Sequence, residues 1–519
     1  MNSIYKTLKE SALNHPSNIA YDFLGYKRSY SEFLDDVNKK AYDLRISGFR
    51  AKEIVTLCLP NIPEALVLFY ALNQIGCIVS FIHPNIPISQ YEATLKSINS
   101  DKLFILNTLT DTIKSLKQVN LFNSMYSVSV STYLQFNKKI FLRVKELYLE
   151  NQLLPHSNLA SQDEALWKTD DTAVILFSGG TTGTAKAIEL TNTNVNSCAI
   201  QTAQNKQGSN HNDKMLAILP LFHGYGLISC IHATISESHQ LILLPFFEEK
   251  LFIKTFKRAK PNYINGIPKL YKKITPLLSQ LNFELDFLKG LYCGGSYLDD
   301  KIRNALNEVL CNKKSTVTIQ EGYGLTEMGG AVTLMPPGEN LTSCVGKPFQ
   351  ETVVMVVDEQ LNEVATGKEG RLCFKSPAVM KGYMNTTTQP FINFEGKWLV
   401  TNDIGYVDNH GYVYYTGRLD RIVKISGYEV HPANVEKVIN QMNNVSNSCV
   451  IPITQSSLTS LKAFVVARNV QTVDIMTHCN KHLPRWSVPK EIEFVSEIPQ
   501  SLFQKNNYNQ LISKEKIRE

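Results

Sequence analysis

The most informative segment of this sequence is Ser178-Gly179-Gly180-Thr181-Thr182-Gly183-Thr184-Ala185-Lys186. It follows an apolar run at residues 172–177 that predicts a buried strand. Glycines let backbone N–H groups approach phosphate oxygens, hydroxyls can donate to the same oxygens, and Lys186 adds a positive charge. The segment is not a Walker A loop, because Thr184 follows Gly183 where that loop has Lys. We interpret it as a polyphosphate-binding loop at a strand end, with a flexible surface turn as the alternative.

Strand and helix patterns alternate on both sides of this segment. Apolar runs at residues 77–82, 216–220, 240–244 and 317–320 predict buried strands, and helical patterns at 63–73, 249–258 and 298–310 separate them. This alternation is typical of an α/β fold with mainly parallel sheets. Asn61 is expected to cap the helix that begins at Pro63.

The pattern changes in the last third of the chain. Short strand patterns at residues 353–357, 370–374 and 412–415 alternate with turn residues, which predicts a β-rich subdomain. Beyond it, a helix at 432–441 and strands at 448–453 and 463–466 predict a small α+β domain. We expect two domains, residues 1–418 and 419–519, and find no internal repeat.

Composition and charge exclude several classes of protein. The chain is 43% hydrophobic and 19% charged, as globular proteins are, and 519 residues allow two to four compact domains. The net charge of +6 is mild and no long Lys/Arg run occurs, so nucleic-acid binding is not indicated, while weak contact with an anionic membrane surface remains open.

Cysteine spacing and hydropathy bear on the compartment. The ten cysteines form no C-x-x-C pair and no zinc-type cluster, which predicts buried thiols in a reducing compartment. Residues 1–16 lack the apolar core of a signal peptide, and residues 65–82 are expected to form a helix and a strand rather than a membrane span. We expect a soluble cytoplasmic protein without a transmembrane segment.

The phosphate-loop segment resembles the signature Ser-Gly-Thr/Gly-Thr-Thr-Gly-x-Pro-Lys of the adenylate-forming superfamily, which contains acyl-CoA ligases, peptide-synthetase adenylation domains and luciferases. Ala185 replaces the usual Pro, and the motif style is most similar to that of fatty-acid and aryl-acid CoA ligases. Further motifs of the superfamily follow in order, so that the resemblance runs from about residue 20 to residue 510. It implies that Ser178, Gly179, Gly180, Thr181, Thr182, Gly183 and Lys186 bind the phosphates of ATP.

Three motifs imply the walls of the substrate site. Residues 220–226 resemble the motif whose His or aromatic side chain borders the acyl pocket, which implies that role for His223. Residues 293–296 resemble the segment that lies along adenine; its three candidate residues are Gly294, Gly295 and Ser296. Residues 322–327 resemble a Tyr-Gly-x-Thr-Glu motif; it places Tyr323 and Gly324 at adenine, Thr326 at the α-phosphate and Glu327 on Mg²⁺, which prefers hard oxygen ligands.

The remaining motifs imply ribose contacts, a hinge and the groups for each half-reaction. Asp403 and Arg418 match the residues that bind the ribose, although Asn402 replaces the usual Gly. Asp420 matches the hinge about which a mobile C-terminal domain turns. The resemblance implies that Lys505 acts in adenylation, and that Lys424 and Gly427 reach the active site for thioester formation. In the motif around Lys505, Gln504 stands where Gly is usual and Tyr508 where Arg is common.

The resemblance implies a two-step reaction that depends on ATP and Mg²⁺. The substrate carboxylate attacks the α-phosphorus of ATP, pyrophosphate leaves, and Lys505 and Thr326 stabilise the charge that develops. The acyl group then passes to a thiol. Coenzyme A is the expected acceptor, and the phosphopantetheine of an acyl carrier protein is the alternative.

The acid is predicted to be a fatty or aryl-alkyl acid, with a medium- or long-chain fatty acid favoured. Amino-acid-activating relatives use an Asp in the second motif, whereas residues 220–229 contain no acidic side chain to pair an ammonium. The expected pocket wall is Phe222, His223, Tyr225, Ile267 and Met328. Two other classes stay open: a nucleotide-binding protein that has lost turnover, suggested by Ala185, Asn402 and Gln504, and a luciferase-like oxygenase.

Overall fold

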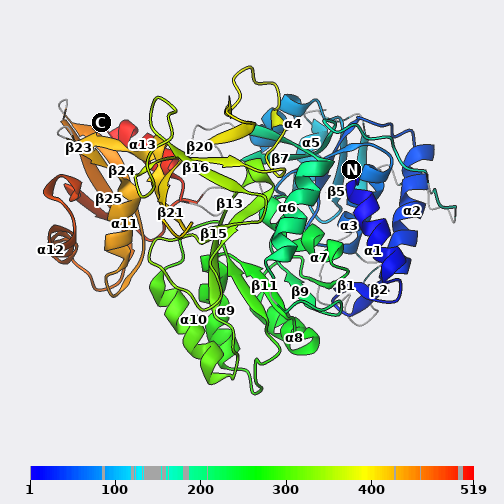
Figure 1. Cartoon of the computed structure of the whole chain (residues 1–519), viewed down its shortest axis with the longest axis horizontal. Helices are drawn as coiled ribbons and strands as arrows, with labels where there is room; N and C mark the ends of the chain where they lie inside the picture. The colour runs from blue at the N-terminus through cyan, green and yellow to red at the C-terminus, as the bar shows by residue number, and fades with distance from the viewer. Residues whose placement is uncertain are drawn as a thin grey trace.

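The computed structural model covers the whole chain and describes all of it except residues 1, 85–87, 119–121, 123, 131–132, 134–153, 155–158, 162, 179–185, 207, 426–427, 456–457, 501–505 and 519. The side chains of residues 89, 90, 429, 455, 458 and 516–518 are also outside this description. A large α/β body is followed by a β-rich layer and then by a small domain at the C-terminal end of the chain (Figure 1). The expected fold class is confirmed.

The first sheet contains the strand that leads into the phosphate-loop segment. Its order is β18-β8-β7-β4-β3-β5-β6. The strands are β3 (Ile54–Cys58), β4 (Ile78–Phe81), β5 (Lys102–Leu106), β6 (Ser124–Val128), β7 (Thr172–Ser178), β8 (Lys186–Thr191) and β18 (Gly382–Tyr383). Strands β3 to β7 run parallel, and β8 turns back antiparallel to β7 so that Ser178 faces Lys186. Both ends of the segment therefore lie together.

The second sheet has the order β15-β14-β13-β12-β11-β9-β10-β1-β2. The strands are β1 (Ile19–Phe23), β2 (Tyr26–Ser29), β9 (Lys214–Ala217), β10 (Gln240–Leu243), β11 (Tyr263–Gly266), β12 (Gly290–Cys293), β13 (Ile319–Leu325), β14 (Gly330–Leu334) and β15 (Lys347–Pro348). From β1 to β13 the neighbours are parallel, and antiparallel strands stand at both edges. The predicted preponderance of parallel pairing is confirmed.

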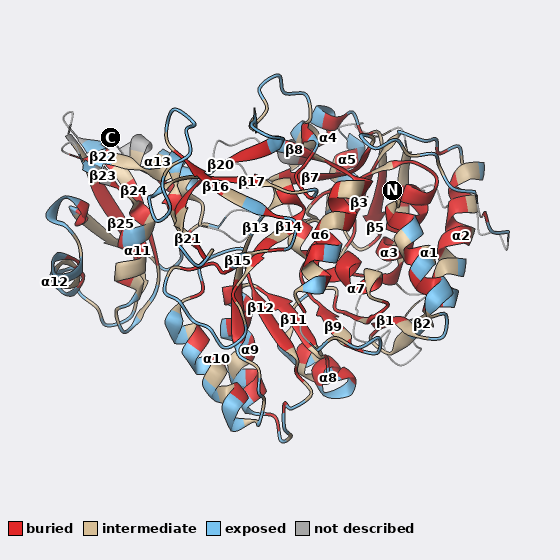
Figure 2. Cartoon of the chain, viewed as in Figure 1, coloured by how far each residue is buried: buried red, intermediate tan, exposed pale blue. Residues whose placement is uncertain are grey.

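Helices pack against both sheets and supply most of the core. They are α1 (Ile4–Asn14), α2 (Tyr30–Ile46), α3 (Pro63–Gln74), α4 (Ile88–Ile98), α5 (Thr110–Gln118), α6 (Asn192–Gln204), the π-helical η3 (Tyr225–His232), α7 (Ala233–Ser236), α8 (Glu249–Ala259), α9 (Pro268–Ser279) and α10 (Asp300–Asn312). One hydrophobic cluster joins residues of both sheets with α1, α2, α3, α6 and η3. Helix α3 is buried almost all round (Figure 2), as a helix enclosed on both sides must be.

The β-rich layer and the small domain complete the chain. The layer has the order β16-β17-β20-β19 with β21 beside β20, all antiparallel. Its strands are β16 (Val353–Val357), β17 (Gly370–Lys375), β19 (Phe391–Asn393), β20 (Lys397–Val407) and β21 (Val413–Arg418). The short helices η4 (Thr326–Met328) and η5 (Leu419–Arg421) follow β13 and β21.

The small domain has its own hydrophobic core. Its elements are β22 (Val423–Ile425), β23 (Tyr428–Val430), α11 (Pro432–Asn440), β24 (Val445–Gln455), β25 (Leu458–Ala467), α12 (Thr472–His482), η6 (Arg485–Ser487), β26 (Glu491–Phe494) and α13 (Tyr508–Arg518). Strand pairing passes to a separate sheet after Arg418, while the division at residues 418 and 419 stays a prediction.

One local prediction was wrong. Asn61 does not cap α3: the residue before the helix is Ile62, which makes no side-chain cap bond. The Asn61 amide instead donates to the carbonyls of Ala217 and Leu219, at 3.0 and 2.9 Å, and so joins the two sheets.

Nine of the ten cysteines are buried. Within the described residues, no helix combines the length and apolar character needed to cross a membrane.

Candidate active site

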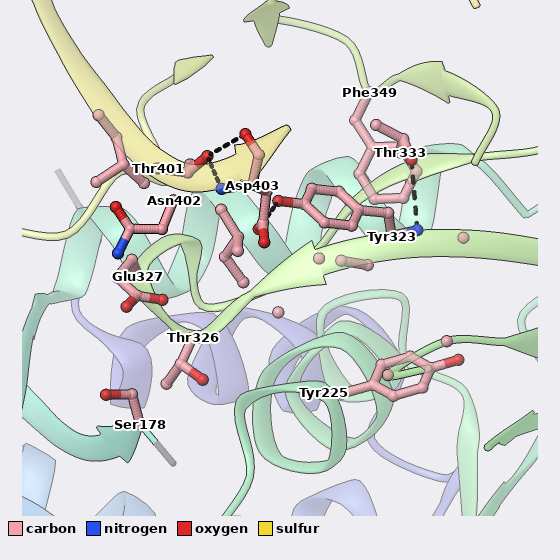
Figure 3. Close-up of a pocket in the computed structure, with 18 of the residues that line it drawn as sticks. Ser178, Tyr225, Tyr323, Thr326, Glu327, Thr333, Phe349, Thr401, Asn402 and Asp403 are labelled. Atoms are coloured by element: carbon pink, nitrogen blue, oxygen red, sulfur yellow. Dashed lines mark hydrogen bonds between the residues drawn. The ribbon is translucent and has the colours of Figure 1, made fainter. Parts of the chain in front are cut away.

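A cavity of about 490 Å³ opens where the carboxyl ends of the parallel strands meet the β-rich layer. This is the edge at which open α/β sheets bind ligands. The predicted site residues in its lining are Ser178, Lys186, His223, Gly294, Gly295, Tyr323, Gly324, Thr326, Glu327, Asp403, Arg418 and Asp420. Figure 3 shows Ser178, Thr326, Glu327, Tyr323 and Asp403 around the same space, although Ser178, Tyr323 and Asp403 come from strands of three different sheets. Sequence motifs separated by more than two hundred residues therefore meet at one site.

Tyr323 and Asp403 form the most strongly connected part of the cavity. The Tyr323 hydroxyl donates to Asp403 Oδ2 at 2.5 Å, and the Tyr323 ring stacks on Phe374 with centroids 5.9 Å apart (Figure 3). Burial, reinforced by the Asp403 charge, raises the pKa of Tyr323 well above its usual range. The phenol therefore stays protonated and holds the buried Asp403 carboxylate in place.

The pairing of β20 with β21 places Arg418 opposite Asp403. Arg418 Nη1 lies 3.4 Å from Asp403 Oδ1, and Arg418 Nε donates to Asp420 Oδ1 at 2.9 Å. The guanidinium thus joins the predicted ribose-binding carboxylate to the predicted hinge residue. These contacts fix the arrangement of charged groups at the junction between the β-rich layer and the small domain.

Thr326 and Glu327 lie on η4, directly after the strand that carries Tyr323. Tyr383 donates a hydrogen bond from its hydroxyl to Glu327 Oε1 at 2.9 Å. Burial and the Glu327 charge raise the pKa of Tyr383, so this donor also stays protonated. Lys186 Nζ lies 4.7 Å from the centroid of the Tyr383 ring. The two ends of the phosphate-loop segment and the Glu327 carboxylate therefore share one wall of the cavity.

Backbone shape explains two of the glycines. At Gly324 a Cβ atom would lie 2.0 Å from the carbonyl oxygen of Gly330, so no side chain fits between β13 and β14. Gly295 has φ of +84°, which other residues rarely adopt. Ser296, the third candidate for the adenine side, is exposed and lies outside the lining that the described residues define.

The predicted acyl side is only partly as expected. His223 and Tyr225 line the cavity, and the His223 Nδ1 atom accepts a hydrogen bond from the Tyr225 backbone N–H at 3.2 Å. Phe222, Ile267 and Met328 are not in the lining of the described residues; the Phe222 ring packs on His83 instead, with centroids 4.3 Å apart. Sequence reasoning missed several lining residues of this side, namely Thr202, Asn205, Lys206, Asn265 and Tyr292.

Several predicted residues fall outside the described residues. These are Gly179, Gly180, Thr181, Thr182, Gly183, Gly427 and Lys505. Lys424 is exposed on β22 and does not line the cavity as the described residues define it. Gln500, which pairs with Asn506 across residues 501–505, accepts a hydrogen bond from Lys269 Nζ at 3.0 Å. Lys269 lies in the first turn of α9, and Ile267, which precedes this helix, lies beside Gly295 of the cavity lining. The residues that flank the Lys505 segment are therefore attached near the cavity.

Comparison with known proteins gives the same class that the fold and the cavity indicate. The AMP-binding enzyme family model matches residues 8–384, and the model of the AMP-binding enzyme C-terminal domain matches residues 434–502. The chain belongs to the AMP-binding enzyme family, the adenylate-forming superfamily that its motifs resemble.

Relatives and solved structures cover nearly the whole chain. A long-chain-fatty-acid–CoA ligase of Bacillus subtilis is 26% identical, with 99% of this chain and 94% of the relative aligned. A probable 4-coumarate–CoA ligase 3 of Dictyostelium discoideum is 28% identical over 92% of this chain and 89% of its own. ATP-bound MatB from Rhodopseudomonas palustris superposes with a TM-score of 0.83 at 21% identity, covering 99% of each chain. The anthranilate CoA ligase AuaEII, in complex with anthranoyl-AMP, superposes with a TM-score of 0.82 at 22% identity, covering 99% of this chain and 97% of the other.

Proposed function

We propose that this enzyme activates a carboxylic acid as an acyl-adenylate, with release of pyrophosphate, and transfers the acyl group to coenzyme A. The observation that carries the proposal is the meeting of Tyr323, Asp403 and Arg418 with Thr326 and Glu327 around one cavity. A nucleotide needs an aromatic face, acceptors for its ribose hydroxyls and groups that face its phosphates, and these residue types supply all three. The relatives named as CoA ligases support the same reaction.

In the proposed adenylation step, an oxygen of the substrate carboxylate attacks the α-phosphorus of ATP and the bond to pyrophosphate breaks. Thr326 donates to the α-phosphate, and Lys505 bridges the substrate carboxylate and the phosphate. The residues from Ser178 to Lys186 bind the outgoing phosphates. No protein group has to abstract a proton, so positioning and preorganised charge supply the rate enhancement. His223 borders the reacting carboxylate on the acyl side.

The chemistry of the Glu327 side suits Mg²⁺. Glu327 offers a hard carboxylate ligand at the cavity wall, and the Tyr383 hydroxyl orients it at 2.9 Å. Bound by Glu327 and the phosphate oxygens, Mg²⁺ would neutralise charge on the phosphates. The contribution of the protein is to fix the orientation of the Glu327 carboxylate through the Tyr383 hydroxyl.

In the proposed second step, the small domain turns about Asp420. Lys505 then leaves the site, and Lys424 and Gly427 approach it beside the pantetheine thiol. The thiolate attacks the acyl carbon, the carbon–oxygen bond to AMP breaks, and AMP leaves. Coenzyme A is the proposed acceptor because the relatives are named for it, and a carrier-protein phosphopantetheine is the second candidate.

Among acids, we infer an extended fatty or aryl-alkyl body rather than an α-amino acid. The carboxylates in the described cavity lining are Glu327, Asp403 and Asp420, which belong to the proposed nucleotide end. The acyl side therefore offers no anionic partner for an ammonium within the described lining. We assign the enzyme to fatty- or aryl-acid metabolism in the cytoplasm, where ATP and coenzyme A are available. Peripheral contact with a membrane surface stays open as a source of the acid.

The test is pyrophosphate release with ATP and Mg²⁺ across acids from acetate to palmitate, with cinnamate, benzoate and amino acids. Each acid is run with coenzyme A, with a holo carrier protein and with neither. We expect release with one class of acid, turnover accelerated by coenzyme A, and loss of release in Lys505→Ala but not in Lys514→Ala, a change of an exposed lysine on α13. ATP binding without release for any acid would instead support the lost-turnover alternative.

A further inference from the structure

One stretch of the acyl side of the cavity is lined mainly by polar residues. Its lining from α6, the residues just after it, β11 and β12 consists of Cys293 and five polar residues, Thr202, Asn205, Lys206, Asn265 and Tyr292. A plain alkyl chain would desolvate these groups without replacing their hydrogen bonds, which is costly. The wall therefore raises the question of which of these groups is available to a substrate.

Three of these five polar residues, Thr202, Asn205 and Lys206, already have partners. The hydroxyl of Thr202 donates to the Cys198 carbonyl at 2.7 Å, and the Asn205 amide donates to the Gln201 carbonyl at 2.7 Å. Lys206 Nζ lies 3.1 Å from Glu237 Oε2. The phenol of Tyr292 points along its own strand, since its oxygen lies 2.5 Å from where a Cβ of Gly290 would be.

Asn265 is different. It is 1% exposed on β11, and its Nδ2 donates to the Ser229 carbonyl at 3.3 Å. Its Oδ1 is buried and has no hydrogen-bond partner within the described part of the chain. Exchanging the two amide atoms would set Oδ1 against the Ser229 carbonyl oxygen, so the amide orientation is fixed. Asn265 is a lining residue of the cavity, and its buried Oδ1 is thus left without a donor from the described part of the chain.

The neighbouring hydroxyls do not supply that donor. Strand pairing places Asn265 opposite Tyr292, whose carbonyl accepts from the Tyr225 hydroxyl at 3.1 Å and from the Tyr271 hydroxyl at 2.9 Å. Burial raises the pKa of Tyr225 and that of Tyr271 well above their usual range, so both remain committed donors. Because Asn265 sits on a strand in the middle of a sheet, it cannot move to find another partner.

We propose that Asn265 is a specificity-determining residue: its Oδ1 accepts a hydrogen bond from a neutral donor, a hydroxyl or an unprotonated amine, on the body of the acid. This inference rests on the proposed ligase function and narrows its substrate class. A charged ammonium is a poor fit, because the described lining of this side holds no carboxylate and Lys206 already forms an ion pair with Glu237. A site built to accept a hydrogen bond rejects the analogue that lacks the donor more strongly than an apolar pocket rejects a polar one.

The experiment compares matched acids in pyrophosphate release with ATP and Mg²⁺. The sets are cinnamate with its 2-, 3- and 4-hydroxy and 4-amino derivatives, and decanoate with a series of hydroxydecanoates. In the wild type, at least one donor-bearing acid should exceed its parent in kcat/KM by about tenfold or more. Comparison of the hydroxy acids with the 4-amino derivative shows whether the donor is a hydroxyl or an unprotonated amine.

Two variants test the residue itself. Asn265→Leu removes the acceptor at similar volume and should abolish the preference, mainly by raising kcat/KM for the parent acid relative to the hydroxy acid. Asn265→Asp keeps an acceptor and should retain the preference. Asn107→Leu is the matched control, because Asn107 also has a buried, unpartnered Oδ1 within the described residues but lies outside the cavity lining. In this variant the ratio of kcat/KM for the donor-bearing acid to that for its parent acid should equal the wild-type ratio.

Equal kcat/KM for parent and donor-bearing acids in the wild type would overturn the inference, while pyrophosphate release would leave the ligase function standing. An unchanged preference in Asn265→Leu would also overturn it, because the donor would then be recognised elsewhere. Absence of release with every acid would contradict the proposed function itself. Should Asn265→Leu fail to fold in circular dichroism, the wild-type ratio and Asn265→Asp still decide the question.

Discussion

Two tyrosine side chains of the cavity orient carboxylates by hydrogen bonds: Tyr323 orients Asp403, and Tyr383 orients Glu327. The Tyr323 hydroxyl donates to Asp403 at 2.5 Å, and in the proposed function the Tyr323 ring is the face for adenine. Replacing Tyr323 by Phe keeps the ring and removes the donor, which leaves a buried carboxylate less well satisfied. A hydrogen bond to a charged group contributes about 1.5–3 kcal/mol. We expect the KM for ATP to rise by about tenfold or more, with a smaller change in kcat.

The measurement is pyrophosphate release against ATP concentration. Tyr414→Phe is the control, because Tyr414 lies on β21, beside the strand that carries Asp403, and outside the cavity lining of the described residues. Its hydroxyl donates to Asp408 at 3.3 Å. An ATP KM in Tyr323→Phe equal to that of the wild type would contradict the assigned role of the phenol.

Tyr383 should act in the same way on the metal side. Its hydroxyl donates to Glu327 at 2.9 Å, and the change to Phe leaves the proposed Mg²⁺ ligand without that support. Loss of such a supporting hydrogen bond commonly costs 10- to 100-fold in metal affinity. We therefore expect the Mg²⁺ concentration for half-maximal activity, measured at saturating ATP, to rise by about tenfold. Unchanged Mg²⁺ dependence would show that Glu327 needs no orienting partner.

At the scale of elements, lysines of the α/β body and the small domain join the two. Lys301 Nζ donates to the carbonyls of Asn440 and Met442 at the end of α11, at 3.3 and 2.9 Å, and Lys437 Nζ donates to Ser343 Oγ at 2.6 Å. Positive charge at a helix C-terminus is stabilising. These contacts hold the small domain in the orientation that brings Gln500 to α9.

Changing Lys301 and Lys437 together to Met should therefore weaken this orientation. Exposed contacts of this kind contribute about 0.2–1 kcal/mol each, so adenylation should slow by roughly two- to fivefold. Thioester formation from supplied acyl-AMP and coenzyme A should not slow. Rapid-quench measurement of each half-reaction tests this, with Lys254→Met on α8 as the control. Equal slowing of both half-reactions would contradict it.

Element-scale prediction from the sequence succeeded where the signal was local. The runs at β10 and β16 and the helix α8 were placed within a residue of their observed bounds. Strand β13 was expected to end at residue 320 but continues to Leu325, because pairing with β14 extends it through a glycine-containing motif that has no strand signature of its own. The Asn61 error has the same origin: its partners, Ala217 and Leu219, are distant in sequence.

At the scale of the whole molecule, the motifs predicted many of the residues that line the cavity but not how its proposed acyl side is built. Tyr323, Asp403 and Arg418 belong to recognisable strings. Asn265 belongs to an ordinary strand, and only the order of strands in its sheet brings it to the cavity. Strand order is set by pairing between distant segments, which periodicity does not encode.

The α/β body also contains a buried group that should make its stability depend on pH. His232 is fully buried between the Tyr70 hydroxyl and Asn196, and burial lowers the pKa of His232 from 6.5 to about 3. Between these values the unfolded chain binds a proton that the folded chain does not. Stability should therefore fall as the pH decreases below about 6.5, by about 1.4 kcal/mol per pH unit from this group.

Urea unfolding between pH 5 and 7 measures this slope. His232→Gln should be less stable than the wild type at pH 7, because its hydrogen bonds are disturbed, but its stability should depend less steeply on pH. An identical slope in the two proteins would show that the imidazole is already protonated in the fold or that other groups control the transition.

The most direct test of the adenylate mechanism follows the oxygen atoms. A substrate acid labelled with ¹⁸O in both carboxylate positions is incubated with ATP, Mg²⁺ and coenzyme A, and the nucleotide product is examined by mass spectrometry. Attack of the carboxylate on the α-phosphorus, followed by cleavage of the carbon–oxygen bond, predicts AMP that carries one ¹⁸O and pyrophosphate that carries none. Unlabelled AMP, or ADP with labelled phosphate, would contradict the account.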